Sequence, residues 1–438
     1  MKKIIGIRHE DKYAMERRCP ITPALIERLL KQSDDIEFHV EKSEKRIFKA
    51  VEFEDAGALM KEDVRQSDVI FGVKEISDAY FEKAKTYVFF SHVIKGQPYN
   101  MPMLKKMMEM ECNLIDYEKV EDETGRRLIF FGKYAGLAGM INSLWSLGLR
   151  LKEFGYRTCF EKIKQAHSYN SLEEVKKVIS EVGFDIIKNG LPQELCPFVV
   201  GFTGYGNVSL GAQEIYNLLP VKEISPDELL HMDNNSEMPQ NVLYKVVFKE
   251  EHIAVPVNKD AKFELQDYYK NPSHYKNAFE QYVPYITVLM NCMYWDAKYP
   301  RIITKAFLKD LYNKNPRPKL TVIGDVTCDP DGSIEATHKG TEIEAPIFVY
   351  NPYSAKPQMG YKGDGLLIMA VDILPSELPR ESSINFSDAL AKYIIPIALA
   401  DYDKDYEELN LPATIKRALI LHKGKLTKSF QYIEKYIN

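Results

Sequence analysis

The stretch FVVGFTGYGNVSLGAQEI, residues 198–215, joins an apolar run, a glycine-rich turn and the start of a helical pattern. Gly204 and Gly206 would permit a tight turn and the close approach of a pyrophosphate, whose charge the start of the helix would hold. Gly211 would keep that helix near the sheet. The spacing GxGxxxxG is two residues longer than the usual dinucleotide fingerprint, so the prediction depends on the strand before it and the helix after it.

A short run after this stretch, PVKEIS at 220–225, predicts a second strand. Glu223 follows Gly204 by nineteen residues, a separation at which an acidic side chain commonly holds the ribose hydroxyls of NAD. The neighbouring Lys222 could instead accept a 2′-phosphate, so the residues leave NAD and NADP open. The expected cofactor-binding residues are Gly204, Tyr205, Gly206, Asn207, Val208, Gly211 and Glu223.

Three apolar runs in the first third of the chain each end in polar side chains. They are DVIFGVKEIS (68–77), TYVFFSHVIKGQ (86–97) and CNLIDYEKVED (112–122). Strand-like and helix-like runs alternate here, which predicts a parallel sheet with helices on both faces. Ligands bind beyond the carboxyl ends of such strands, so we expect Lys74, His92 and Glu118 to share one site.

Length, composition and charge indicate an ordinary globular protein and argue against several other classes. A chain of 438 residues suits two or three domains, and 45% hydrophobic with 28% charged residues is typical of a globular protein. A net charge of −5 with both signs interspersed argues against nucleic-acid and membrane partners, and no apolar run is long enough to span a bilayer. Six cysteines without CxxC spacing indicate reduced thiols and no metal site. No mitochondrial presequence is visible, so we expect a cytoplasmic protein.

Several stretches together resemble the lysine-forming saccharopine dehydrogenases, also called lysine–2-oxoglutarate reductases. The resemblance is strongest to the reductase half of the bifunctional aminoadipic semialdehyde synthases, and alanine dehydrogenase is similar more distantly. The stretches keep their order over nearly the whole chain: ERRCPITP, GVKEI, TYVFFSHVIKGQ, LIDYEKVED, GRRLIFFGKYAGLAGMIN, GFTGYGNVSLGAQ, MNCMYWDAKYPRIIT and GDVTCDPDGSIE.

The resemblance implies an α/β fold with two Rossmann-like domains on parallel sheets and an active-site cleft between them. The first domain would be discontinuous, comprising 1–145 and 336–438, and 146–335 would bind the dinucleotide. A long helix predicted over 132–155 has a suitable length to join the two domains.

The implied reaction is the NAD(P)H-dependent reductive condensation of L-lysine with 2-oxoglutarate to saccharopine, and its reverse. Lys74 and His92 match the acid–base pair of the family. Asp329 falls where the family places an aspartate near the nicotinamide, although Asp325 and Asp331 in the same stretch compete with it.

The resemblance also implies the residues that hold the substrates. Glu75 and Glu118 follow acidic positions that would orient the two bases and tune their charge. Arg18 and Arg127 match arginines that contact substrate carboxylates. Arg17 is chemically an equal cation, and only the motif favours Arg18.

The sequence leaves the choice of nicotinamide cofactor and two alternative functions open. The glycine loop looks like that of the bifunctional animal enzymes, which use NADPH, whereas Glu223 favours NAD, so we expect NADPH or NADH with a slight preference for NADPH. A separate glutamate-forming saccharopine dehydrogenase would oxidise the product. The alternatives are an amino acid dehydrogenase similar to alanine dehydrogenase and a non-catalytic, dinucleotide-binding regulatory protein.

Overall fold

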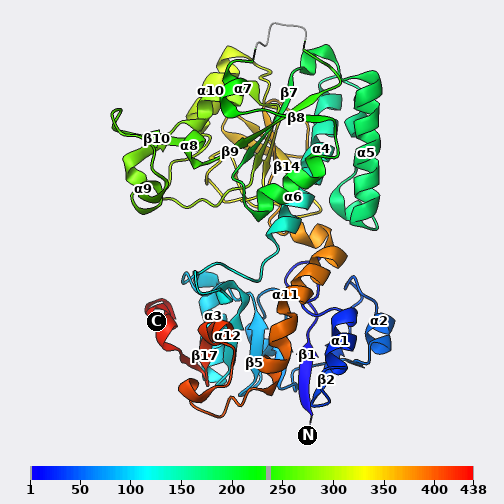
Figure 1. Cartoon of the computed structure of the whole chain (residues 1–438), viewed down its shortest axis with the longest axis vertical. Coiled ribbons are helices and arrows are strands. Elements are labelled where there is room, and N and C mark those ends of the chain that lie inside the picture. Colours follow the sequence, from blue (N-terminus) through cyan, green and yellow to red (C-terminus); the bar gives the residue numbers. More distant parts are fainter. Residues whose placement is uncertain (1, 233–237, 438) are drawn as a thin grey trace. The chain divides into compact units, whose positions relative to one another are not determined.

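The chain forms two compact units, each built on one eight-stranded sheet (Figure 1). The computed structural model describes residues 2–232 and 238–437. Unit 1 comprises Met1–Phe131 and Pro379–Asn438, and unit 2 comprises Gly132–Leu378. Both sheets are mostly parallel, which confirms the predicted α/β class.

The sheet of unit 1 has the order β18-β17-β6-β5-β4-β1-β2-β3. Strands β1 to β6 run parallel, and β17 and β18 add an antiparallel edge. Strands β4 and β5 are buried along their whole length, as expected for central parallel strands covered on both faces. The strands are β1 (Lys3–Ile7), β2 (Ile36–Glu41), β3 (Leu59–Lys61), β4 (Val69–Phe71), β5 (Thr86–Phe89), β6 (Asn113–Asp116), β17 (Leu419–His422) and β18 (Lys425–Leu426).

Helices from both ends of the chain cover this sheet. Helix α11 packs against α1, β1 and β2, so the C-terminal segment joins the same core as the N-terminal strands (Figure 1). The helices are α1 (Pro23–Leu30), α2 (Ala50–Asp55), α3 (Met101–Glu109), α11 (Pro379–Leu399), α12 (Ala413–Arg417) and α13 (Glu434–Ile437).

The sheet of unit 2 has the order β15-β14-β16-β13-β12-β7-β9-β8. Its strands are β7 (Phe198–Thr203), β8 (Val221–Glu223), β9 (Leu243–Phe248), β12 (Val288–Asn291), β13 (Val322–Asp325), β14 (Ile347–Asn351), β15 (Lys356–Met359) and β16 (Leu366–Met369), and β10 (Ala254–Pro256) and β11 (Tyr275–Asn277) form a separate pair. Its helices are α4 (Gly132–Glu153), α5 (Leu172–Asn189), α6 (Asn207–Tyr216), α7 (Pro226–Leu230), α8 (Glu250–Ile253), α9 (Leu265–Lys270) and α10 (Lys305–Lys314). None of the helices described has the length and apolar character that crossing a membrane requires.

The boundaries between the units differ from those expected at 145/146 and 335/336. Helix α4 lies wholly in unit 2, where it packs against α6, β13 and β16. Strands β14, β15 and β16 complete the sheet of unit 2, so the chain returns to unit 1 only at Pro379. Helix α4 is therefore part of the interior of unit 2 and not a rod between two domains.

The backbones of α4 and α6 approach each other closely at two glycines, one in each helix. A Cβ on Gly136 would stand 1.9 Å from the carbonyl oxygen of Val208, and one on Gly211 would stand 2.1 Å from that of Lys133. Both separations are too short for any side chain, so α4 and α6 pack this closely only because both positions are glycine. Gly211 thus serves helix–helix packing and not the helix–sheet packing that the sequence predicted.

Candidate active site

Glu75 and His92 meet beyond the carboxyl ends of β4 and β5. Glu75 Oε1 lies 2.7 Å from His92 Nδ1 and 2.6 Å from Lys12 Nζ. Burial alone would raise the pKa of Glu75, but the hydrogen bond and charge of His92, together with Lys12, lower it to about 2. Because an ionised carboxylate only accepts hydrogen bonds, His92 Nδ1 donates, and Nε2 remains as the ring atom that can exchange a proton with a ligand.

The backbone at His92 is held in an uncommon conformation. Its φ is +50°, in the left-handed region that residues other than glycine seldom adopt. The Phe90 ring stacks on the imidazole with centroids 6.1 Å apart, and Asn100 Nδ2 donates to the carbonyls of Ser91 (3.1 Å) and His92 (3.3 Å). Such outliers persist only where surrounding contacts fix them, and they concentrate at functional sites.

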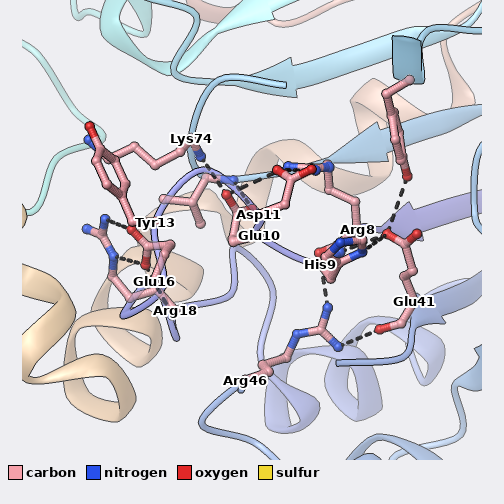
Figure 2. A network of polar contacts seen from close by, with 12 residues as sticks. Arg8, His9, Glu10, Asp11, Tyr13, Glu16, Arg18, Glu41, Arg46 and Lys74 are labelled. Atoms are coloured by element: carbon pink, nitrogen blue, oxygen red, sulfur yellow. Dashed lines mark hydrogen bonds and ion pairs between the residues drawn. The ribbon is translucent and has the colours of Figure 1, made fainter. Parts of the chain in front are cut away.

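Lys74 follows β4 and lies beside the loop that leaves β1 (Figure 2). Its backbone N–H donates to Glu10 Oε2 at 2.9 Å, and its Nζ lies 5.7 Å from the centre of the Tyr13 ring. The residues that sequence reasoning missed, Glu10, Lys12 and Tyr13, all belong to this loop. A signal was present, because β1 also ends in a polar run.

The two expected carboxylate-binding arginines have different surroundings. Arg18 is 4% exposed and forms a two-point ion pair with Glu16, with Nε–Oε1 at 2.8 Å and Nη2–Oε2 at 2.6 Å (Figure 2). Its guanidinium also lies 4.2 Å from the centre of the Phe131 ring. Arg127 is 40% exposed, and its Nη2 pairs with Glu118 Oε1. Arg127 is therefore the more accessible cation, and the fork of Arg18 is engaged by Glu16.

A buried carboxylate connects the loops that carry His92 and Glu118. Asp116 ends β6 and accepts hydrogen bonds from the Ser91 hydroxyl, from Ser91 N at 3.0 Å and from Glu118 N at 2.7 Å. Burial raises the pKa of Asp116 to about 6, although the Ser91 hydrogen bond opposes that rise. Asp116 thus holds the residues after β5 and the residues after β6 in place relative to each other.

In unit 2, the glycine loop has the geometry that a phosphate requires. Gly204 follows β7 with φ +77°, and Gly206 caps the N-terminus of α6, which begins with Asn207 and Val208. A Cβ on Gly206 would meet no atom of the described chain within 4 Å, so the space beside this residue is open. The free N–H groups of a helix N-terminus bind anions, and these residues therefore fit a dinucleotide pyrophosphate.

The structure does not bring Glu223 to this loop. Glu223 ends the edge strand β8, which β9 separates from β7. In the sheet, Glu223 pairs with Lys245 of β9, and Lys245 pairs in turn with Val200 of β7. Val200 lies three residues before β7 ends at Thr203. Glu223 is 62% exposed and pairs with Lys245 Nζ at 2.8 Å. The spacing from Gly204 predicted that Glu223 would lie beside the glycine loop. It does not, because β9 lies between β7 and β8 in the sheet.

Another acidic residue, Glu250, follows the strand that adjoins β7. It is the first residue of α8, separated from the end of β9 only by Lys249, and accepts a hydrogen bond from the Tyr269 hydroxyl at 2.7 Å. Its charge raises the pKa of Tyr205, the half-exposed residue between the two loop glycines. A cavity of about 200 Å³ opens beside it. The lining is largely aromatic: Glu250, Ile253, Tyr268, Tyr269, Met293, Tyr294, Trp295, Tyr299, Pro300 and Ile302.

The structure separates the three competing aspartates of residues 324–335. Asp325 ends β13, is 1% exposed and accepts hydrogen bonds from Asn291 Nδ2 at 2.8 Å and Thr337 Oγ1 at 2.5 Å. Burial raises its pKa to about 6. Asp331 pairs with Lys305. Asp329 is exposed on the loop that Asp325 fixes, which suits a group that meets a ligand.

Comparison with known proteins adds family and fold information. Residues 6–138 match the model of the alanine dehydrogenase/PNT N-terminal domain. The alpha-aminoadipic semialdehyde synthase of Arabidopsis thaliana is 36% identical over 98% of this chain, which spans only 41% of that protein. The lysine-forming, NAD(+)-type saccharopine dehydrogenase of Yarrowia lipolytica is 26% identical over 91% of this chain and 93% of its own.

Solved structures agree on the architecture. An L-alanine dehydrogenase structure covers 99% of this chain with a TM-score of 0.61 at 15% sequence identity. At that identity the likeness concerns the fold alone, and it is the two-unit α/β fold described above. The chain spans less than half the length of the plant relative.

Proposed function

From the homology of this chain with alpha-aminoadipic semialdehyde synthases and lysine-forming saccharopine dehydrogenases, we propose that it condenses L-lysine with 2-oxoglutarate and reduces the product to saccharopine, with NAD(P)H as donor. The same site would run the reverse reaction. The observation that supports this most is the set of titratable groups around Glu75, His92 and Lys74 at one sheet edge.

The proposed reaction needs several proton transfers. The lysine ε-amine must lose a proton before it attacks the ketone carbon, and the resulting carbinolamine must lose water to give an imine. A bound nicotinamide would supply the hydride that reduces this imine. We assign the proton transfers to Lys74 and His92, with Glu75 holding the ring of His92 so that Nε2 faces the ligand.

Saccharopine has three carboxylates, so the site also needs cations. We assign one carboxylate to Arg127, because its guanidinium is partly exposed and its partner Glu118 is only partly buried as well. Arg18 is buried against Glu16, and we assign it the second contact, which a ligand makes only by sharing the guanidinium with Glu16.

For the donor we propose NADH in preference to NADPH, which reverses the slight preference for NADPH expected from the sequence. Glu250 stands where the strand next to β7 ends, beside Tyr205 of the glycine loop. A carboxylate there accepts the ribose hydroxyls and repels a 2′-phosphate. The aromatic cavity beside it offers flat faces to an adenine ring.

The donor preference is measured as the ratio of kcat/KM for NADH to that for NADPH. We expect the ratio to exceed one in the native protein and to fall by about tenfold, equal to about 1.4 kcal/mol, in Glu250→Gln. Glu223→Gln is the matched control and should leave the ratio unchanged. A native preference for NADPH, or an effect of Glu223→Gln alone, would reject the assignment of Glu250.

The reaction itself is tested by its product. Purified protein with lysine, 2-oxoglutarate and NADH should form a compound with the mass of saccharopine, in step with the loss of nicotinamide absorbance. Nicotinamide oxidation without that product would refute the proposal.

A further inference from the structure

We propose that Glu10 is a positioning residue that ties the loop after β1 to the loop after β4 and so sets the place of Lys74. The inference rests on the proposed function, because Lys74 acts there as an acid–base group. Glu10 is 3% exposed, yet both of its carboxylate oxygens are bonded (Figure 2). Oε1 accepts the N–H of Val73 at 2.7 Å, and Oε2 accepts the N–H of Lys74 at 2.9 Å.

Arg8 favours the charged form of Glu10 inside the protein. Burial raises the pKa of Glu10, and the charge of Glu16 adds to that rise. The charge of Arg8 and the two backbone N–H groups oppose it without cancelling it. Arg8 is 1% exposed, and its Nη1 lies 3.8 Å from Glu10 Oε2, while its Nη2 donates to Asp11 Oδ1 at 2.8 Å. Within the part of the chain that the structure describes, Arg8 Nε and Nη1 make no hydrogen bond, so the cation acts on Glu10 through its charge. Burying a carboxylate beside a cation is costly unless hydrogen bonds satisfy the buried atoms, as the N–H groups of Val73 and Lys74 do for Glu10.

The loop that Glu10 anchors carries other groups of the same site. Lys12 pairs with Glu75, and Tyr13 presents its ring to the Lys74 amine. Glu16 also faces Lys74, whose charge helps to lower the pKa of that carboxyl, although burial opposes this and Arg18 contributes more. The two hydrogen bonds of Glu10 therefore fix the backbone of Lys74 relative to the residues that surround its amine.

Glu41 provides a matched control on the same sheet edge. It ends β2, is 5% exposed, and accepts the N–H of His9 at 2.8 Å while pairing with His9 Nδ1 at 2.9 Å. It resembles Glu10 in burial and in bonding to backbone, but its backbone bond goes to His9 and not to the loop of Lys74. Replacing either carboxylate by an amide should lower stability, and only one replacement should disturb Lys74.

The first test compares the kinetics of Glu10→Gln and Glu41→Gln. In Glu10→Gln the new side-chain amide would accept only one of the two N–H groups and would present its own donors to the other. We expect kcat for saccharopine formation to fall ten- to a hundredfold, as small misplacements of reacting groups commonly cause. The KM for 2-oxoglutarate should change less than about threefold, and the pH profile of kcat should shift. Glu41→Gln should lower the melting temperature and leave the pH profile unchanged.

A second measurement does not depend on activity. Amide hydrogen exchange at Val73 and Lys74 should be slow in the native protein, faster in Glu10→Gln, and unchanged in Glu41→Gln. Glu10→Asp, which keeps the charge but shortens the reach, covers the case in which Glu10→Gln does not fold. It should also speed exchange at these amides.

Unchanged exchange or an unchanged pH profile in a folded Glu10 variant would overturn the positioning role. A native protein without turnover of lysine and 2-oxoglutarate would instead refute the proposed function, and the exchange data would still report on Glu10.

Discussion

At the scale of single residues, the ends of the predicted strands indicated the candidate site, whereas the long-range partners of its residues could not be predicted from the sequence. Lys74 and His92 were found because polar side chains close apolar strands, and both lie at the carboxyl edge of the sheet. Lys12 and Glu10 were missed because their partners, Glu75 and the backbone of Lys74, are more than sixty residues away. The polar run after β1 marked their loop, but the pairs themselves depend on the order of the strands, which no local pattern contains.

His92→Gln tests the proton transfer directly. We expect kcat to fall by about 10²-fold, because glutamine cannot exchange a proton at the position of Nε2. Nicotinamide absorbance with lysine and 2-oxoglutarate gives the rate, and circular dichroism checks the fold. Turnover within about twofold of the native rate would remove His92 from the mechanism.

The lowered pKa of Glu75 predicts how stability depends on pH. Its pKa falls from an ordinary 4.5 to about 2, so its stabilisation is complete above pH 4.5 and is lost as the pH falls towards 2. The contribution is on the order of 3 kcal/mol, from about 1.4 kcal/mol per pKa unit. Melting temperatures across this window should fall more steeply for the native protein than for Glu75→Gln. Parallel curves would contradict the lowered pKa.

At the scale of elements, the motif of residues 198–215 correctly predicted its own strand, turn and helix, but not the elements that pack beside them. The strand, the turn and the helix are present as β7, a glycine loop and α6. The partner of Gly211 proved to be helix α4 and not the sheet, and the strand beside β7 proved to be β9 and not β8. Local spacing indicates which elements form, whereas their neighbours depend on contacts across the whole unit.

Two alanine substitutions in this motif should separate binding from packing. Gly206→Ala places a methyl group in open space, so stability should stay within about 0.5 kcal/mol while the Kd for NADH rises about tenfold. Gly211→Ala drives its methyl against the carbonyl of Lys133 and should cost roughly 1–3 kcal/mol. Thermal melts and nicotinamide fluorescence titrations measure the two effects. A Gly206→Ala protein that binds NADH normally would contradict the phosphate site.

At the scale of the whole molecule, the proposed acid–base groups belong to unit 1 and the glycine loop belongs to unit 2. The discontinuous path of the chain followed from the resemblance, and its exact limits did not. Strands β14 and β16 look like any other buried strands until they are paired, and β15 is an exposed edge strand. Pro379, and not residue 336, is where the chain re-enters unit 1.

Because Lys74 and the glycine loop belong to different units, a change at Lys74 should affect catalysis and not dinucleotide binding. Lys74→Met should abolish saccharopine formation, because methionine cannot transfer a proton. It should leave the Kd for NADH unchanged within about twofold, because the glycine loop is on the other unit. Fluorescence titration of the inactive variant checks this, and loss of dinucleotide binding would show that Lys74 acts on the cofactor.

The most direct test of the proposed reaction is the rate of nicotinamide oxidation with lysine plus 2-oxoglutarate, measured beside the rate with pyruvate plus ammonia. We expect turnover with lysine plus 2-oxoglutarate, whether NADH or NADPH is the donor, and no turnover with pyruvate plus ammonia. Turnover only with pyruvate and ammonia would contradict the proposed reaction and assign the protein to an alanine dehydrogenase activity.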